Sequence, residues 1–192
     1  NYSSLVKENP DQKDGEPLLF MKAPGSVHLA LNGLRYPTTI RKMWVEVEVA
    51  LIIGEACSGI SASEAAGRIC GVTLASDVSA ENVQGRDHHL ARSKAIDGFC
   101  PMLPYILTGV DTSNLKMSTW VNNRQTQEGG TAERILDDAE SVSFISKFIS
   151  LEPGDLVLTG TPKGALDSIA KPKDKIYHVI ESIGELDFEI TI

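Results

Sequence analysis

The run Trp44-Val45-Glu46-Val47-Glu48-Val49-Ala50-Leu51-Ile52-Ile53-Gly54 decides the fold of this 192-residue chain. Apolar residues at every second position predict a β-strand, because successive side chains of a strand point to opposite faces. The odd-numbered residues then form one face, which is wholly apolar, and the even-numbered residues form the other. Glu46 and Glu48 therefore point the same way, from a face that is otherwise partly apolar.

Two carboxylates roughly 7 Å apart, at about 3.3 Å of rise per residue, repel each other unless water or a cation lies between them. A strand with one face in water is one interpretation of Glu46 and Glu48. A divalent cation held by oxygen ligands is the other. Asp77, at the end of the predicted strand 71–77, is the natural third ligand, although it could instead cap the turn that follows. Three carboxylates, with water completing the coordination shell, suit Mg²⁺ or Mn²⁺.

The composition is that of a compact globular protein, with 42% apolar residues, 23% charged residues and a mean hydropathy of -0.08. The net charge of -8 and the scattered basic residues argue against a nucleic-acid partner. No apolar run approaches the ~20 residues of a membrane span. The three cysteines form no Cys-x-x-Cys pair, which favours reduced thiols in the core of a cytoplasmic protein. No signal peptide is visible, and what precedes Asn1 is open.

The rest of the chain predicts many strands and few helices. We expect strands at 17–22, 71–77, 156–158, 176–180 and 186–192, a long polar loop at 79–94, and a helix, whole or in two pieces, over 131–149. Ser61 and Glu64 form a capping box that begins a further helix at 61–69. Because strands and helices do not alternate regularly, the pattern favours an α+β fold with mixed sheets. Without a linker or repeat, residues 1–192 are interpreted as a single domain.

A second strong signal is the segment 151–164, which contains Thr159-Gly160-Thr161-Pro162. Glycines beside threonines can present backbone N–H groups and hydroxyls to a carboxylate or phosphate, although a tight turn after a buried strand is equally compatible with the pattern. It is not a Walker motif, because Lys163 precedes a glycine instead of following one. The four histidines lack metal-ligand spacing. Lys94 could contact a bound anion or lie on the surface.

Taken together, these residues resemble the fumarylacetoacetate hydrolase superfamily, with its motifs in the same order over nearly the whole chain. The resemblance rests on an Asn1-Tyr2 opening with Glu8, a Phe20-Met21-Lys22 segment, the Glu46/Glu48 strand, the segment around Asp77, the 121–129 hairpin and the Pro153 to Pro162 segment. It implies a mixed β-sheet roll of the type found in the C-terminal domain of that enzyme. It also implies a homodimer and places residues 1–16 as a possible lid.

The resemblance also implies roles for individual residues. Glu46, Glu48 and Asp77 would bind Mg²⁺ or Mn²⁺, and Lys94 would lie beside the substrate. The substrate itself would be held by Lys22, Gln84, Thr159, Gly160 and Thr161. Such a site would act on a small 2-oxo acid that chelates the metal, with the metal and Lys94 stabilising an enolate.

Two departures from the family pattern bear on the reaction. Leu5 stands where hydrolase members carry a lid histidine, and leucine cannot take a proton. Glu81 stands where the family usually carries an arginine, and Arg86 or Arg92 could substitute for it. The sequence from Lys94 to Pro101 is most similar to the isomerase and decarboxylase branch of aromatic compound catabolism. We therefore expect a Mg²⁺-dependent isomerase or decarboxylase of a 2-oxo or enol dicarboxylic acid, with Glu8 as the remaining proton-transfer residue. The alternatives are an acylpyruvate-type hydrolase and a silent copy that pairs with an active subunit.

Overall fold

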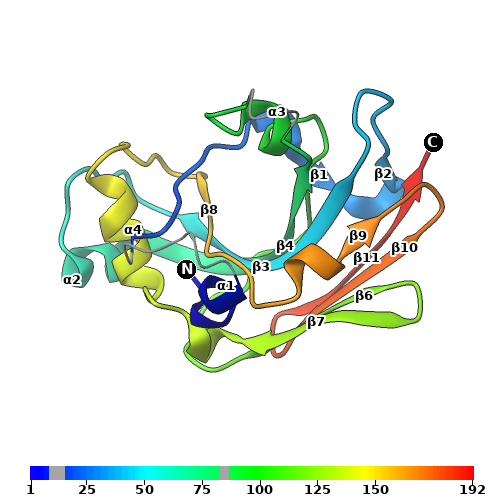
Figure 1. The fold of residues 1–192 in the computed structure, drawn as a ribbon. Helices are drawn as coiled ribbons and strands as arrows, with labels where there is room; N and C mark the ends of the chain where they lie inside the picture. The colour runs from blue at the N-terminus through cyan, green and yellow to red at the C-terminus, as the bar shows by residue number, and fades with distance from the viewer. Residues whose placement is uncertain (9–15, 83–86) are drawn as a thin grey trace.

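The computed structural model describes residues 1–8, 16–82 and 87–192. Its described residues form two β-sheets that lie against each other, with short helices around them (Figure 1). The first sheet is built on two long antiparallel strands, β3 (Met43–Ile53) and β4 (Ile69–Ala80). On the far side of β4 it continues with β5 (Cys100–Met102) and β1 (Val27–Leu29). The other edge of β3 pairs with two short strands, β9 (Ile169–Ala170) and β8 (Leu156–Leu158).

The second sheet has the strand order β2-β11-β10-β6-β7. Its strands are β2 (Leu34–Arg35), β6 (Lys116–Val121), β7 (Arg124–Gly130), β10 (Lys175–Ile180) and β11 (Gly184–Thr191). Parallel pairs (β1 with β5, β2 with β11) occur beside antiparallel pairs in the two sheets. The described residues therefore confirm the predicted α+β fold with mixed sheets.

The core lies between the two sheets. The odd-numbered face of β3 supplies fully buried side chains to it, as the alternation predicts, and β10 and β11 supply Ile176, Ile180 and Ile190 from the opposite sheet. Burial of each such aliphatic side chain contributes about 1.5–3 kcal/mol. The face that carries Glu46 and Glu48 is turned away from this core, toward the side on which the candidate site lies.

Short helices complete the described fold. The α-helices are α1 (Ser3–Glu8), α2 (Ala62–Ala65), α3 (Ala91–Lys94) and α4 (Asp138–Ser146). The 3₁₀ helices are η1 (Pro24–Ser26), η2 (Ala30–Asn32), η3 (Ala66–Arg68), η5 (Thr131–Glu133) and η6 (Ala165–Asp167). The predicted capping box of Ser61 and Glu64 is present at the start of α2. None of the helices in the described residues is both long and apolar enough to span a membrane.

The structure corrects several predicted elements. No strand forms within 17–22, because this segment crosses the face of the first sheet, where Lys22 contacts Asp77. Asp77 does not end its strand, since β4 runs on to Ala80 between two partner strands. The predicted loop at 79–94 accordingly begins later and includes α3. The 131–149 region forms two separate pieces, η5 and α4, which is one of the two predicted alternatives. Cys57 and Cys100 are buried, but Cys70 is exposed, so the prediction of three core cysteines was wrong for Cys70.

Candidate metal centre

Three carboxylates meet on the outer face of the β3–β4 pair. Glu46 lies directly opposite Asp77 in the antiparallel register, and Glu48 follows on the same face of β3. One carboxylate oxygen from each of the three residues lies within 4.8 Å of the other two. Because β3 and β4 are the central strands of their sheet, the backbone holds these oxygens in a fixed arrangement.

The cluster is largely removed from water. Glu48 is 3% exposed and Asp77 is fully buried, whereas Glu46 is partly exposed. Burial, followed by repulsion from Asp77 and Glu46, raises the pKa of Glu48 well above its usual value. Burial also raises the pKa of Glu46, and the nearby Lys94 ammonium opposes this rise. The carboxylates therefore need positive charge close to them to stay ionised.

Two lysines supply part of that charge. The Nζ atom of Lys22 donates to Asp77 Oδ1 at 2.6 Å, and the Nζ atom of Lys94 donates to Asp77 Oδ2. Lys94 also lies 2.5 Å from Ser79 Oγ and 3.6 Å from Glu46 Oε1. Although burial alone would lower it, the carboxylates of Glu46 and Asp77 raise the pKa of Lys94 to about 12. In the metal-free protein Lys94 therefore carries its proton at neutral pH.

Glu48 has a different set of partners. Its Oε2 accepts a hydrogen bond from the backbone N–H of Gly160 at 2.6 Å. Among the described residues no lysine or arginine forms an ion pair with it. A buried carboxylate without a direct ion pair, beside two further carboxylates, fits an oxygen-ligated divalent cation such as Mg²⁺ or Mn²⁺. The residues present would thus hold such a metal through Glu46, Glu48 and Asp77.

The Thr159-Gly160-Thr161 loop is attached to β3. The hydroxyl of Thr159 donates to the carbonyl of Val49 at 3.0 Å, and that of Thr161 donates to the carbonyl of Val47 at 2.8 Å. Gly160 between them has a φ of 92°, a conformation that L side chains rarely adopt. Both hydroxyls are thereby engaged with the metal strand, so a contact of this loop with substrate falls to its backbone groups.

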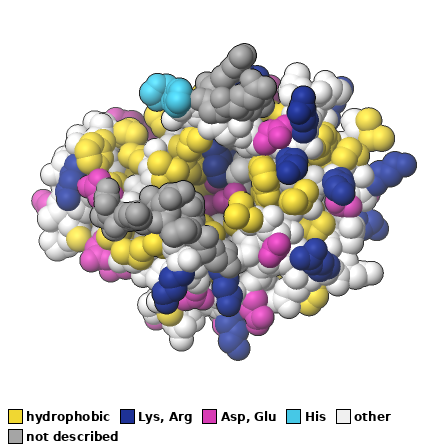
Figure 2. Space-filling view, in the orientation of Figure 1, with side chains coloured by type: hydrophobic (Ala, Val, Ile, Leu, Met, Phe, Trp, Pro, Cys, Tyr) yellow, Lys and Arg dark blue, Asp and Glu magenta, His cyan; other side chains and the backbone are white. Residues whose placement is uncertain are grey.

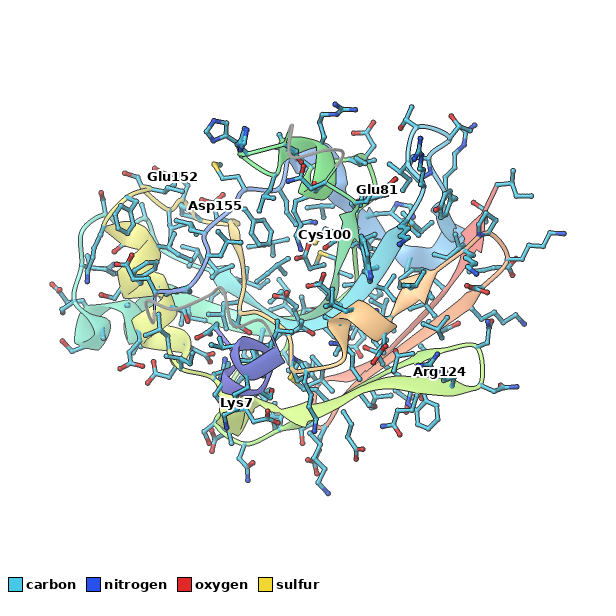
Figure 3. All side chains as sticks on the ribbon, in the orientation of Figure 1. Lys7, Glu81, Cys100, Arg124, Glu152 and Asp155 are labelled. Carbon is cyan, nitrogen blue, oxygen red and sulfur yellow. The ribbon has the colours of Figure 1, made fainter. Side chains whose placement is uncertain are left out.

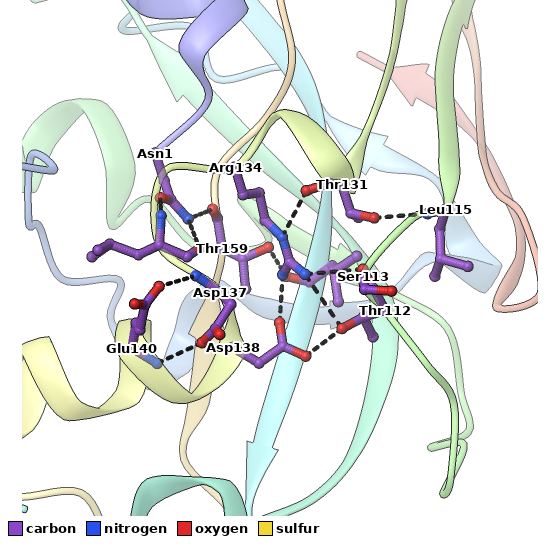
Figure 4. A network of polar contacts seen from close by, with 12 residues as sticks. Asn1, Thr112, Ser113, Leu115, Thr131, Arg134, Asp137, Asp138, Glu140 and Thr159 are labelled. Carbon is purple, nitrogen blue, oxygen red and sulfur yellow. Dashed lines mark hydrogen bonds and ion pairs between the residues drawn. The ribbon is translucent and has the colours of Figure 1, made fainter. Parts of the chain in front are cut away.

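Two side chains outside the loop fix its position. Asn1 Nδ2 donates to the carbonyl of Thr159 at 2.9 Å and to that of Leu136 at 3.1 Å. Figure 4 shows Asn1 within a polar network that also holds Arg134, whose guanidinium pairs with Asp138 and Thr112. This network connects the first residue of the chain with the start of α4 and with the loop that reaches Glu48.

Gln127 on β7 holds the other end of the loop and β3 together. Its Nε2 donates to Thr161 Oγ1 at 2.9 Å and to the carbonyl of Pro162 at 3.0 Å. Its Oε1 accepts from the backbone N–H of Val47, the residue between the two glutamates, at 3.3 Å. Between the residues of β3 that pair with β9 and those that pair with β8, some backbone N–H and C=O groups of β3 thus form their hydrogen bonds with side chains. Gln127 is 1% exposed, so these bonds are shielded from water.

The structure brings together most of the predicted site residues. Glu46, Glu48, Asp77, Lys22, Lys94 and Gly160 converge, and Thr159 and Thr161 support them from behind. Gln84 and Arg86 lie outside the described residues, as does the side chain of Glu8, the last residue of α1. Leu5 on α1 packs against the core. Glu81 accepts from the backbone N–H of Arg41 at 2.8 Å, and Arg92 is exposed on α3.

Three contributors to the site were not predicted. Ser79 donates to Glu46 Oε1 at 2.8 Å, and the centre of the Phe20 ring lies 4.5 Å from Lys94 Nζ. Gln127 is the third, through its hydrogen bonds to the 159–161 loop and to β3. Ser79 could have been found from its spacing, because it lies two residues after Asp77 and so shares its face of β4. Phe20 and Gln127 reach the site from distant segments, and local sequence carries no signal for such contacts.

Cys100, labelled near the centre of Figure 3, lies on the same sheet as the carboxylates. It packs with Ala50 and Ala75 in a small apolar cluster beside the site. Burial raises the pKa of its thiol to about 12, so Cys100 is an uncharged apolar neighbour and not a nucleophile at neutral pH.

The family model for the fumarylacetoacetate hydrolase C-terminal domain matches residues 1–191. The chain belongs to this family. The fold agrees with it, since a 2-hydroxyhepta-2,4-diene-1,7-dioate isomerase from Mycobacterium marinum superposes with a TM-score of 0.84 at 35% identity, over 92% of this chain and 69% of that one. The family is therefore established by both sequence and fold.

Two further members of the fumarylacetoacetate hydrolase family represent different reactions. A fumarylpyruvate hydrolase from Pseudomonas aeruginosa, solved with Mn²⁺ and pyruvate, has a TM-score of 0.90 at 25% identity, covering 100% of this chain and 86% of that one. A bifunctional isomerase/decarboxylase of 4-hydroxyphenylacetate degradation from Escherichia coli is 31% identical over 97% of this chain and 44% of its own length. Members of the family are thus enzymes of small organic acids with isomerase, decarboxylase or hydrolase activity.

Proposed function

We propose that this chain is a metal-dependent enzyme that isomerises or decarboxylates a small 2-oxo or enol dicarboxylic acid. The observation that carries the proposal is the buried triad of Glu46, Glu48 and Asp77 with Lys94 ion-paired beside it. A Mg²⁺ or Mn²⁺ ion held there would act as a Lewis acid toward the carboxylate and the 2-oxo oxygen of the substrate. The proposal treats residues 1–192 as one catalytic domain. This single domain, the homodimer and the cytoplasmic location all stay predictions.

Within this site each residue of the chain has a distinct task. Lys94 keeps its proton at Nζ, and its ammonium would balance negative charge that develops on the substrate oxygen. Lys22 and Lys94 together fix the orientation of the Asp77 carboxylate, because Lys22 donates to Oδ1 and Lys94 donates to Oδ2. The Gly160 N–H orients Glu48 in the same way. Glu8 is the proposed proton-transfer residue, since α1 carries Leu5 in place of a side chain that could activate water.

The hydrolase reaction is a second candidate. The likeness of the fold to a fumarylpyruvate hydrolase favours it, at a TM-score of 0.90. In that reaction Glu8 alone would position the attacking water. The missing histidine in α1 is the reason that we rank hydrolysis below isomerisation and decarboxylation.

Product analysis tests these proposals. Purified protein with Mg²⁺ or Mn²⁺ would be incubated with oxaloacetate, acylpyruvates and 2-oxo-heptenedioates, and the products would be identified by NMR. We expect CO₂ release or a shifted double bond, lost in Glu46→Ala and Glu48→Ala. Formation of two acids would favour the hydrolase, and unchanged turnover in both variants would exclude the metal centre. A silent copy would bind neither Mg²⁺ nor oxalate in a calorimetric titration.

A further inference from the structure

A row of buried polar side chains crosses the second sheet. His178 on β10 lies directly opposite Thr119 on β6, and Thr119 lies directly opposite Gln127 on β7. His178 and Thr119 are fully buried, and Gln127 is 1% exposed. The histidine side chains visible on the face drawn in Figure 2 therefore do not include His178. Such a row is costly in free energy unless each of its polar groups finds a hydrogen-bond partner.

The row faces a pair of residues on the inner side of the metal strands. Ser76 on β4 lies directly opposite Val47 on β3 in the antiparallel register. Ser76 directly precedes Asp77, and Val47 lies between Glu46 and Glu48. Because successive side chains of a strand alternate, Ser76 and Val47 point toward the core while the three carboxylates point to the outer face. The row of the second sheet therefore lies behind the metal centre.

Hydrogen bonds connect the row to this pair at both of its ends. The Nε2 atom of His178 lies 3.0 Å from Ser76 Oγ, and its Nδ1 atom lies 2.9 Å from Thr119 Oγ1. Thr119 Oγ1 donates to Gln127 Oε1 at 2.8 Å. The same Oε1 atom accepts from the backbone N–H of Val47 at 3.3 Å. A continuous chain of hydrogen bonds thus connects β4 to β3 through the core.

This chain of hydrogen bonds has one direction. Thr119 gives its proton to Gln127, so it accepts from the Nδ1–H group of His178. Burial lowers the pKa of His178 to about 3, so the ring is neutral at pH 7 and its Nε2 atom accepts from the hydroxyl of Ser76. Residue 178 therefore has to donate on one side and accept on the other. An amide side chain can also do both, whereas an apolar side chain can do neither.

The Gln127 end of the row also holds the loop that reaches Glu48. Gln127 Nε2 donates to Thr161 Oγ1 at 2.9 Å, and the hydroxyl of Thr161 donates in turn to the carbonyl of Val47 at 2.8 Å. Gly160, next to Thr161, donates its N–H to Glu48 Oε2 at 2.6 Å. A residue adjacent to each of the three carboxylates is therefore held by the network, although the network touches none of the carboxylates itself.

We propose that His178 and Thr119 are positioning residues of the metal centre, which hold β3, β4 and the 159–161 loop at the spacing that a divalent cation requires. This inference rests on the proposed function, because it takes the carboxylate triad as the metal site. The hydrogen bonds fix the positions of the two strands, and these positions set the distances among the three carboxylates. Removal of outer groups that orient metal ligands typically lowers metal affinity by roughly 10–100-fold.

The test measures the Mn²⁺ affinity of variants that break one link of the chain of hydrogen bonds. Thr119→Val keeps the shape of the side chain but removes its hydroxyl, whereas Thr119→Ser keeps the hydroxyl. His178→Leu removes both hydrogen bonds of the ring, whereas His178→Gln can donate and accept. By calorimetry under fully native conditions we expect a Kd about tenfold higher in Thr119→Val and His178→Leu. Thr119→Ser and His178→Gln should stay within about threefold of the wild type, because they keep the links.

A core variant outside the network and a double variant separate positioning from a general loss of stability. Ile190→Val is the matched control, because Ile190 is fully buried in the same sheet and has an apolar side chain. It should lower the Tm without changing the Mn²⁺ affinity. The double variant Thr119→Val/His178→Leu should bind Mn²⁺ no more weakly than the weaker single variant, because one broken link already interrupts the chain. Affinity losses that multiply would contradict the proposal.

Nitrogen NMR of the histidine rings gives a readout that is independent of metal affinity and of activity. The spectrum at pH 7 should contain a neutral ring with its proton on Nδ1, assigned to His178 by its absence in His178→Gln. A proton on Nε2 would make Nδ1 the acceptor of the Thr119 hydroxyl, which could then no longer donate to Gln127. That result would interrupt the chain and overturn the proposal.

The outcomes also separate this inference from the proposed function. If the wild type fails to bind Mn²⁺, the proposed function is wrong and the positioning role falls with it. If the wild type binds Mn²⁺ and the folded Thr119→Val protein binds it equally well, only the positioning role is overturned. Thr119→Val is nearly equal in size to the wild type, so this comparison stands even if His178→Leu does not fold. An affinity loss in Ile190→Val as large as that in Thr119→Val would likewise contradict the positioning role.

Discussion

Glu46 and Asp77 lie directly opposite each other in the antiparallel pair of β3 and β4. Side chains of directly opposed residues have Cβ atoms only about 4.5–5.5 Å apart, and like charges in this position destabilise a sheet. Nevertheless both carboxylates sit on the two central strands of the first sheet, with Glu48 next to them. The fold therefore maintains a repulsive arrangement that a bound cation would relieve, which gives the first prediction.

Glu48→Gln should stabilise the metal-free protein and abolish its stabilisation by metal. Glutamine keeps an oxygen that can accept from the Gly160 N–H, and it cannot ionise. It therefore removes the burial cost and the repulsion from Asp77 and Glu46 that raise the pKa of Glu48. We expect a gain of about 1 kcal/mol without metal, or roughly 2–4 °C in Tm. With Mn²⁺ at 100 times its Kd, the wild type should gain about 2.7 kcal/mol and the variant nothing. Thermal unfolding with EDTA and with Mn²⁺ measures both effects.

The matched control for this variant is Glu152→Gln, an exposed glutamate that follows the end of α4 and precedes β8. It should respond to Mn²⁺ as the wild type does. A metal-free Glu48→Gln protein that unfolds at a lower temperature than the wild type would contradict the view that the triad is strained without metal.

Lys94→Met should lower kcat by about 10²–10³ if the ammonium stabilises charge on the substrate oxygen, a loss typical of removing one such group. In the metal-free protein burial lowers the pKa of Lys94, but the neighbouring carboxylates outweigh burial and raise it to about 12. We therefore expect Lys94 to stay charged between pH 6 and 9. The pH dependence of activity in this range should accordingly have the same shape in the wild type and in Lys94→Met. Steady-state kinetics across this pH range, with exposed Lys147→Met as control, checks the prediction. If activity depends on pH on the alkaline side in the wild type but not in Lys94→Met, Lys94 acts as a proton acceptor.

The alternation in β3 was sufficient to predict that Glu46 and Glu48 share a face, because this property depends on local geometry alone. Asp77 was assigned to the site correctly but placed at the end of a strand. Ser79 and Ala80 continue β4 because β3 pairs with them there, and the polar residues that follow gave no sign of this. The residue at which a strand ends depends on the strands that pair with it, so sequence predicts strand ends less well than strand faces.

The threonines of the 159–161 loop show a second limit of prediction. A Thr-Gly-Thr pattern suggested hydroxyls that face a ligand, whereas the structure turns both hydroxyls to carbonyls of β3. Which way a hydroxyl points depends on the unpaired backbone groups nearby, and these come from a strand more than 100 residues earlier in the chain. The same reasoning applies to Phe20, which reaches Lys94 across the sheet face.

Gln127→Met should destabilise the protein and weaken metal binding, although Gln127 touches none of the three carboxylates. The change removes partners from the Val47 N–H and from Thr161, and burial prevents water from replacing them. Each buried group left without a partner costs about 1–3 kcal/mol, so we expect a loss of at least about 2 kcal/mol. Exposed Gln125 lies on the same strand, and Gln125→Met is the matched control.

Two measurements distinguish a positioning role of Gln127 from a purely structural one. Chemical denaturation gives the loss of stability, and calorimetry with Mn²⁺ under fully native conditions gives the metal affinity. A positioning residue should lower the metal affinity about tenfold or more even where all of the protein is folded. A variant that is less stable but binds Mn²⁺ as the wild type does would reduce Gln127 to a packing role.

His178 should make the protein lose stability on acidification. It is fully buried between the sheets, where its ring nitrogens lie 3.0 Å from Ser76 Oγ and 2.9 Å from Thr119 Oγ1. Because Thr119 donates its hydroxyl proton to Gln127, the neutral ring carries its own proton on Nδ1 and accepts from Ser76 at Nε2. Burial lowers the pKa of His178 from 6.5 to about 3.

Between pH 6.5 and about 3 the unfolded chain binds a proton at His178 that the folded protein does not bind. Stability from this residue is thus fully present above pH 6.5 and falls by about 1.4 kcal/mol for each pH unit below it. His178→Gln keeps a donor and an acceptor but cannot titrate. Its stability difference between pH 7 and pH 4.5 should be smaller than that of the wild type by about 2–3 kcal/mol. Urea denaturation at both pH values measures this difference, with exposed His88→Gln as the control that should behave as the wild type does. Parallel stability curves for the wild type and His178→Gln would show that the ring accepts a proton in the folded state.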